Sequence, residues 1–284
     1  MNLLKALIGS GTFALVTLAG SSSVAAMTIT TSTDANQLAT MLLGSGIALV
    51  PGSASLTAPS GSTGIFLNDT SLFGGVSTDG VLLTSGLATN ALAPNDSTSI
   101  SFPHGAPGSP FTDALAGGST FDAATLSFNI IPDFSGSIEW SYVFASDEYE
   151  EFIGKFNDAF GLAVGGINKA LIPGSGIPVS IDTVNPSSNA VFYRTNQPQS
   201  FETQYDGLTS VLKATTAVTA GNEYTLTFAI ADNKDDAFDS GVFIKANSIK
   251  KLDDAPGPLP LFGALSAIAW SRRLRLRTQK RNMN

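Results

Sequence analysis

The sequence contains no cysteine and only one histidine, His104. The absence of cysteine excludes disulfide bridges, thiolate zinc sites, iron–sulfur clusters and cysteine nucleophiles. A single histidine excludes a multi-histidine metal site and makes a Ser–His–Asp triad hard to build. Oxygen atoms are therefore the main ligands that this chain can offer to a metal ion.

Charge is also scarce, and what there is has one dominant sign. Charged residues make up 13% of the 284 residues, about half the usual share. All 23 acidic residues lie between Asp34 and Asp254, where only eight residues are basic, a balance of −15. Such a body repels phosphates, so nucleic acid is not an expected partner. The hydrophobic content of 43% is enough for a core, and 28 glycines and 14 prolines favour strands and turns.

Residues 1–26 have the pattern of a secretory signal peptide. Lys5 supplies the positive start, residues 6–19 are mainly apolar, and small residues precede a predicted cleavage between Ala26 and Met27. The alternative is a buried N-terminal helix, which the three glycines of this segment disfavour.

Residues 255–284 contain, in order, a proline motif, a short apolar segment at 261–270 and a basic cluster at 272–281. The motif residues are Pro256, Gly257, Pro258, Leu259 and Pro260. This order resembles a PEP-CTERM sorting tail, although the motif departs from that family's Pro-Glu-Pro. The resemblance implies a hydrophobic anchor helix in the inner membrane, an exosortase-type sorting enzyme as partner, and a Gram-negative-type bacterium. The alternative is a basic amphipathic helix resting on a membrane.

Residues 27–254 are expected to form one all-β domain. Apolar residues alternate with polar ones at 125–130, 137–144 and 224–230, which is typical of half-buried strands. About ten short strands separated by turns predict a two-layer antiparallel β-sandwich, jelly-roll-like. One short N-terminal helix is predicted from an Asp34 cap to Gly44.

Three acidic stretches stand out in this domain, at 145–152, 156–160 and 231–241. The first and third directly follow predicted strands, so they emerge at the same end of the sandwich if those strands are neighbours and run in the same sense. Clustered carboxylates repel one another, and Ca²⁺ binds six to eight oxygen ligands. The candidate calcium ligands are Asp147, Glu148, Asn157, Asp158, Asp232 and Asp239.

Two other interpretations of the acidic residues remain open. Glu148, Asp158, Asp232 or Asp239 could accept backbone N–H bonds and hold loops in place. Glu148 and Glu151 could instead act as the carboxylate pair of a glycoside hydrolase.

Aromatic residues divide into two groups in the same region. Trp140, Tyr142 and Phe144 alternate regularly and are expected in the core. The aromatic residues outside clean alternation are candidates for a ligand surface, and they are Tyr149, Phe152, Tyr193 and Tyr205.

Five separated motifs of this domain are distinctive. They are Ala145-Ser146-Asp147-Glu148-Tyr149, Phe156-Asn157-Asp158-Ala159-Phe160, Tyr205-Asp206-Gly207-Leu208-Thr209, Ile230-Ala231-Asp232 and Asp239-Ser240-Gly241-Val242-Phe243. Together they resemble the choice-of-anchor L domain, a family of exported bacterial proteins with varied C-terminal anchors. The resemblance implies export, surface anchoring and a β-sandwich, but no reaction and no ligand.

Together these features predict an exported, surface-anchored, non-enzymatic protein. Its expected role is adhesion or attachment to exopolysaccharide or other surface glycans, with Ca²⁺ as a candidate cofactor. The alternatives are a secreted carbohydrate-active hydrolase and a purely structural coat protein. No catalytic residue is assigned.

Overall fold

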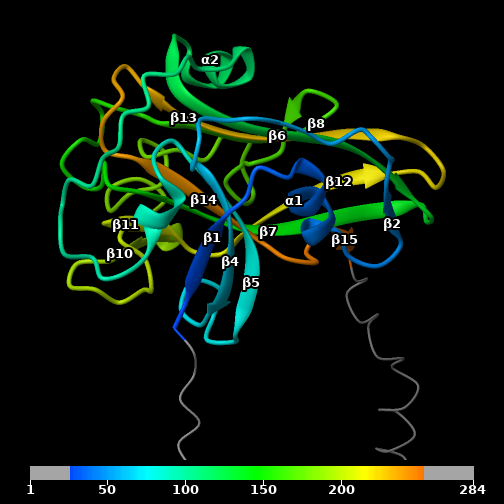
Figure 1. The fold of residues 1–284 in the computed structure, drawn as a ribbon, viewed down its shortest axis with the longest axis horizontal. Coiled ribbons are helices and arrows are strands. Elements are labelled where there is room, and N and C mark those ends of the chain that lie inside the picture. Colours follow the sequence, from blue (N-terminus) through cyan, green and yellow to red (C-terminus); the bar gives the residue numbers. More distant parts are fainter. Residues whose placement is uncertain (1–25, 253–284) are drawn as a thin grey trace, which may run out of the picture.

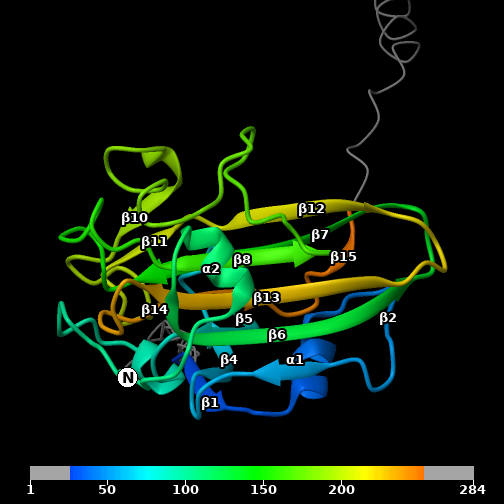
Figure 2. The ribbon, with the colours of Figure 1, turned by 90° about the horizontal axis from the view of Figure 1, so that it is seen from above.

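The computed structural model describes residues 26–252, which form two antiparallel β-sheets packed face to face (Figures 1 and 2). The nine-stranded sheet contains β1 (Thr28–Thr31), β4 (Thr63–Asp69), β5 (Thr78–Thr84), β7 (Gly136–Ser146), β10 (Tyr193–Thr195), β11 (Gly207–Thr209), β12 (Leu212–Val218), β14 (Ser240–Lys245) and β15 (Lys250–Lys251). The six-stranded sheet contains β2 (Ile47–Leu49), β3 (Ser55–Thr57), β6 (Thr120–Pro132), β8 (Ala159–Val164), β9 (Ile167–Asn168) and β13 (Tyr224–Asn233). The predicted β-sandwich is therefore confirmed. The predicted signal segment and sorting motif lie outside the described residues, apart from Ala26.

The main core lies between the two sheets. The inward side chains of β7, which include Trp140, Tyr142 and Phe144, are at most 1% exposed, as their alternation predicts. From the opposite sheet, Phe128 of β6 and Phe228 of β13 stack with ring centroids 5.6 Å apart.

A second, smaller core covers the outer face of the nine-stranded sheet. In β14, Val242 and Ile244 point into the main core, whereas Phe243 belongs to the second core and packs edge-on against Phe66 of β4. Both faces of β14 are therefore buried. This double burial explains why the sequence of this strand lacks the polar alternation of an ordinary surface strand.

Two α-helices accompany the sheets, α1 (Ala35–Leu42) and α2 (Pro110–Ala116), together with the 3₁₀ turns Ala88–Ala91 and Ala190–Phe192. The predicted Asp34 cap of α1 is confirmed, but the helix ends at Leu42, because Leu43 is already extended. Helix α2 was not predicted. Its signals are a Ser109 cap, Pro110 in the first turn and the left-handed Gly117 at its end.

Removing the Asp34 cap is expected to destabilise the protein modestly. The Asp34 carboxylate accepts hydrogen bonds from the N–H groups of Asn36 and Gln37 at 2.9 and 3.1 Å. The Asp34→Ala variant is therefore expected to lose about 1 kcal/mol of unfolding free energy in urea titrations. Asp34→Asn, which keeps a capping oxygen, is the control and should lose much less. Equal losses in the two variants would contradict the capping role.

Candidate cation site at one end of the sandwich

Four strand ends meet at one end of the sandwich. In the nine-stranded sheet, Ser146 at the end of β7 pairs with Ser240 at the start of β14. In the other sheet, Ala231 of β13 pairs with Ala159 at the start of β8. Residues 234–239 then cross from β13 to β14, that is, from one sheet to the other. The predicted acidic stretches thus share one end, although β7 and β13 lie in different sheets and are not neighbours within one sheet.

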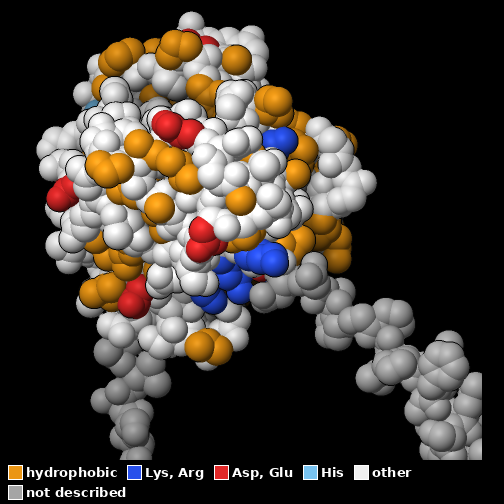
Figure 3. Space-filling view, turned by 90° about the vertical axis from the view of Figure 1, so that its right-hand side faces the viewer, with side chains coloured by type: hydrophobic (Ala, Val, Ile, Leu, Met, Phe, Trp, Pro, Cys, Tyr) orange, Lys and Arg blue, Asp and Glu red, His pale blue; other side chains and the backbone are white. Residues whose placement is uncertain are grey.

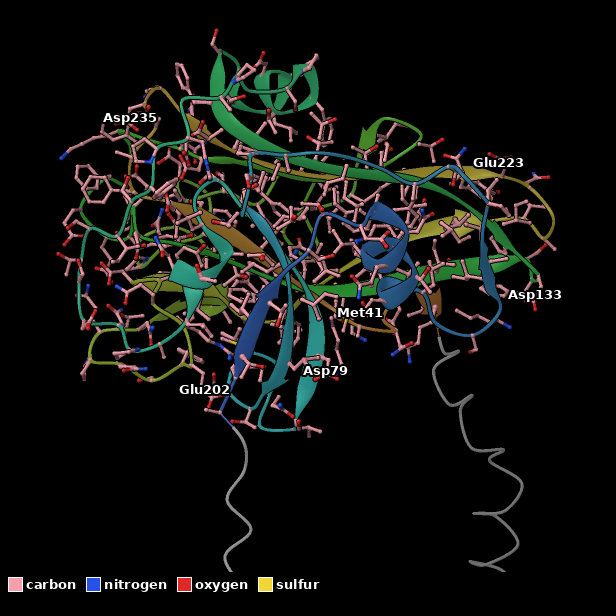
Figure 4. The ribbon with its side chains drawn as sticks, in the orientation of Figure 1. Met41, Asp79, Asp133, Glu202, Glu223 and Asp235 are labelled. Carbon is pink, nitrogen blue, oxygen red and sulfur yellow. The ribbon has the colours of Figure 1, made fainter. Side chains whose placement is uncertain are left out.

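This arrangement gathers seven carboxylic residues, which we call the acidic end: Asp147, Glu148, Asp158, Asp206, Asp232, Asp235 and Asp239. All of them except Asp235 are buried. Figure 4 labels Asp235 at this end, on the opposite side of the molecule from Asp133 and Glu223. Buried acidic groups normally require a charged or hydrogen-bonding partner.

Many oxygen atoms of the acidic end have no such partner. Both carboxylate oxygens of Asp147, Glu148 and Asp232 are buried and accept no hydrogen bond. The same is true of Oδ2 of Asp206 and Oδ1 of Asp235. No lysine or arginine of residues 26–252 forms an ion pair with these groups. The ion pairs of this part of the chain both involve Glu139, which is not part of the acidic end. Unpaired ionised carboxylates in such surroundings are strongly destabilising.

Burial raises the pKa of Asp147 to about 9, and the charges of Asp206 and Asp239 add to the effect. The backbone N–H of Asp206 favours the charged form of Asp147 but makes no hydrogen bond of normal geometry to it. Burial likewise raises the pKa of Glu148 to about 9, with further contributions from Asp158 and Asp235. Asp147 and Glu148 therefore hold protons near neutral pH unless a cation replaces them.

Asp232 lies between these groups. Burial raises its pKa well above the ordinary value, and the charge of Asp158 raises it further. The hydroxyl of Ser85 favours the charged form of Asp232, yet its hydrogen bonds are to the backbone of Ser240. Asp232 thus remains without a hydrogen-bond partner, although it lies close to several other carboxyls.

Other predicted ligands hold loops in place instead. Asp158 accepts hydrogen bonds from the N–H of Asn233 at 3.1 Å and from the Ser240 hydroxyl, and so ties the two sheets together. Asp239 accepts the N–H of Phe102 at 3.1 Å. The interpretation that some acids hold loops is therefore confirmed for Asp158 and Asp239, whereas Glu148 and Asp232 accept no such bond.

Asn157 has a structural role at the same end. Its side-chain oxygen accepts the N–H of Asp182 at 3.0 Å, and its backbone oxygen accepts a bond from the Asn233 amide at 3.2 Å. As a metal ligand it would have to share an oxygen atom already used in a hydrogen bond.

The acidic end is not a preformed metal cage. Within residues 26–252, no three Asp, Glu or His side chains are grouped as they would be around one metal ion. Calcium tolerates irregular geometry and completes its shell with backbone carbonyls and water. A bound Ca²⁺ would therefore have to draw unpaired carboxylates together, and Asp147, Glu148 and Asp232 have the oxygens available to do so.

Sequence reasoning missed Asp206 as a member of this cluster. It directly precedes β11, and β11 lies beside the end of β7 because Gly207 pairs with Ser146. Oδ1 of Asp206 accepts a bond from Asn95 at 2.9 Å, which leaves Oδ2 unpaired. Its sequence signals were its place in the Tyr205–Thr209 motif and its negative charge in a chain with few charges. Neither signal places it at the acidic end, because the pairing joins residues about sixty positions apart.

Two of the four aromatic candidates for a ligand surface are in fact buried. Tyr149 is 0% exposed, packs against Gly207 and donates its hydroxyl to the carbonyl of Val184 at 2.7 Å. Tyr205 is 2% exposed, and its hydroxyl lies 2.9 Å from that of Thr84. Long-range packing therefore explains both residues, whereas Phe152 and Tyr193 are half-buried.

The proposed hydrolase pair is split between two environments. Glu148 is buried, whereas Glu151, three residues later, is exposed. A glycosidase needs both carboxyls facing one sugar, so this pair has no common surface as the loop now stands.

Comparison with known families gives one match. The family model described as choice-of-anchor L domain matches residues 26–250. Neither the curated proteins nor the solved structures include a match. In addition, no helix among the described residues is long and apolar enough to span a membrane.

Proposed function

The chain belongs to the choice-of-anchor L domain family, and from this premise we propose that it is an attachment protein of the extracellular matrix whose acidic end is ordered by Ca²⁺. Membership of the family indicates an exported, surface-associated protein that is sorted by an anchor. The attachment role and the calcium are our additions. The observation that carries the calcium proposal is the set of buried, unpaired carboxylates at Asp147, Glu148 and Asp232.

Calcium would supply what the chain lacks at this end. The acidic loops connect both sheets, and their charges repel one another without a counter-ion. A divalent cation would offset two of these negative charges and hold the loops that supply them, so that the end of the sandwich becomes a rigid surface for contact with a partner. This role requires no reaction, which fits a non-enzymatic surface protein.

The anchor is proposed from the sequence alone. The proline motif at 256–260, the short apolar segment and the terminal basic cluster resemble a PEP-CTERM tail. We propose that an exosortase-type enzyme handles this tail at the inner membrane of a Gram-negative-type bacterium. The protein would then reach the cell surface or the extracellular matrix.

Binding to immobilised polysaccharide tests this function. The purified full chain is applied to xanthan and dextran surfaces, in EDTA and in millimolar Ca²⁺. We expect retention to be at least about fivefold greater with Ca²⁺, since a coupling free energy of about 1 kcal/mol between calcium binding and polysaccharide binding corresponds to that ratio. Asp232→Asn should abolish the calcium effect, and Asp133→Asn, an exposed acid at the other end, should leave it unchanged.

Two outcomes would overturn the proposal. Equal retention in EDTA and Ca²⁺ on every surface would contradict the proposal that attachment depends on calcium. Release of reducing sugar ends that Glu148→Gln abolishes, without a change in thermal stability, would favour the hydrolase instead.

A further inference from the structure

Three lysines line one cavity on the outer face of the nine-stranded sheet. Lys213, Lys245 and Lys250 surround a cavity of about 440 Å³, which we call the lysine pocket. This volume falls within the range of ligand-binding pockets. Figure 3 shows a group of basic side chains on this side of the molecule, beside the place where the described chain ends. In a domain with only eight basic residues, such a group calls for an explanation.

The sheet register builds the pocket. Along β7, Glu139 and Ser141 point outward because Ile138, Trp140 and Tyr142 point into the core. Lys213 of β12 pairs with Ser141 on one side of β7, and Lys250 of β15 pairs with Glu139 on the other.

Positive charge exceeds negative charge in the pocket. Glu139 is the one carboxylate among its lining residues, and it is 5% exposed. Its oxygens lie 2.9 Å from Nζ of Lys213 and 4.0 Å from Nζ of Lys250. Within residues 26–252, Lys245 forms no ion pair, and its Nζ lies 5.9 Å from the ring centroid of Phe73. Lys213 and Lys250 thus both contact Glu139, whereas no carboxylate of the described residues pairs with Lys245, so the charge of Lys245 is available to a ligand.

The uncharged lining suits a sugar better than a bare anion. Ser141 and the exposed Asn247 offer hydroxyl and amide groups, and Phe73 and Val211 offer apolar surface. The hydroxyls of a sugar ring can form hydrogen bonds with Ser141 and Asn247, and its apolar face can pack against Phe73 and Val211.

The acidic end does not cancel this attraction. Along β14, Lys245 lies five positions after Ser240, which borders the acidic end, and this is about 16 Å of strand. At physiological ionic strength the screening length is about 8 Å. The lysine pocket therefore has its own local potential, and it shares no residue with the acidic end.

We propose that the lysine pocket binds the carboxylate of an acidic sugar, a uronate residue of a polysaccharide, with Lys245 as its main charge partner. The inference rests on the proposed attachment function in one respect, namely that the protein encounters acidic polysaccharide outside the cell. Its site is a different one, and it requires no calcium.

Titration of the full chain with trigalacturonate in EDTA tests this proposal, with maltotriose as the uncharged sugar of similar size. We expect saturable binding of trigalacturonate that weakens as salt is added, and no binding of maltotriose. Lys245→Gln should weaken binding by about tenfold, as expected for the loss of one hydrogen bond to a charged group. Lys169→Gln, which changes a lysine outside the pocket, should bind as the parent does.

A second variant covers the case in which Lys245→Gln fails to fold. Asn247 has a positive φ of 54°, so Asn247→Gly keeps the backbone and removes only the amide. It should weaken binding while the melting temperature stays the same. Absence of trigalacturonate binding, or equal binding by the Lys245→Gln and Lys169→Gln variants, would overturn the proposal. So would binding to phosphatidylglycerol vesicles alone, because that would assign the pocket to lipid.

These outcomes are separate from those of the proposed function. The uronate titration contains EDTA, so it does not depend on a calcium site. If the protein does not bind uronate but Ca²⁺ still raises its stability, the pocket proposal fails and the calcium proposal stands. If the protein binds uronate but Ca²⁺ does not change its stability, the calcium proposal fails and the pocket proposal stands.

Discussion

Millimolar Ca²⁺ is expected to raise the melting temperature of the full chain by about 5–10 °C over its value in EDTA. A ligand present at about 100 times its Kd stabilises the folded state by about 2.7 kcal/mol. For a domain of this size, each kcal/mol corresponds to about 2–4 °C. The effect arises because Asp147, Glu148 and Asp232 are buried without partners and would gain one in the cation.

Matched variants show where the cation binds. Asp232→Asn should remove most of the calcium-induced shift, because it replaces an unpaired carboxylate of the acidic end. Asp133→Asn should retain the full shift, because Asp133 is exposed at the opposite end (Figure 4). An unchanged melting temperature on adding Ca²⁺ would contradict the calcium proposal. It would indicate that these carboxyls are protonated in the folded protein.

In EDTA, the stability of the protein is expected to fall as the pH rises from about 5 to about 9. The pKa values of Asp147 and Glu148 are raised to about 9, chiefly by burial. In the unfolded chain these groups titrate near pH 4. Between the two values the folded state binds more protons than the unfolded state, so raising the pH favours unfolding, by about 1.4 kcal/mol per pH unit for each proton released. The stabilisation is complete below pH 4 and is lost towards pH 9.

Chemical denaturation at several pH values, with EDTA or with Ca²⁺, measures this slope. Calcium should flatten it, because the cation takes the place of the protons. Asp147→Asn removes one titrating group, so in EDTA at pH 8 it should be more stable than the parent. In Ca²⁺ at the same pH it should be less stable. A parent whose stability rises from pH 5 to pH 9 in EDTA would show that these carboxyls are ionised and paired in the folded state.

Strands with one buried face were predictable from the sequence. In β7 the side chains of Trp140 and Tyr142 alternate with polar ones, and this local pattern is enough to predict both the strand and its inward face. Strand β14 gave a weaker signal, because Phe243 on its other face is buried in the second core. Helix α2 had clear capping signals at Ser109 and Gly117, but it is only seven residues long and lies among turn-forming residues.

The sequence indicated a grouping of the acidic stretches at one end only if β7 and β13 were neighbours, whereas the structure groups them across the two sheets. The state of each carboxyl was not predicted. Asp158 and Asp232 look equivalent in the sequence, since each adjoins an apolar strand. In the structure Asp158 accepts two hydrogen bonds, whereas Asp232 accepts none. The difference depends on Asn233 and Ser240, which are 75 and 82 residues from Asp158 along the chain.

The sequence by itself determined the all-β class, the capped first helix, the aromatic core and the oxygen-rich character of any metal site. Each of these follows from composition or from patterns within a few residues. Only the tertiary structure decided which carboxyls are unpaired, that Asp206 joins them, and that Lys213, Lys245 and Lys250 face one cavity. The physical reason is that β7 pairs with β11, β12, β14 and β15, all of them distant in sequence. Side chains that share a site on this sheet are brought together by register, which no local pattern encodes.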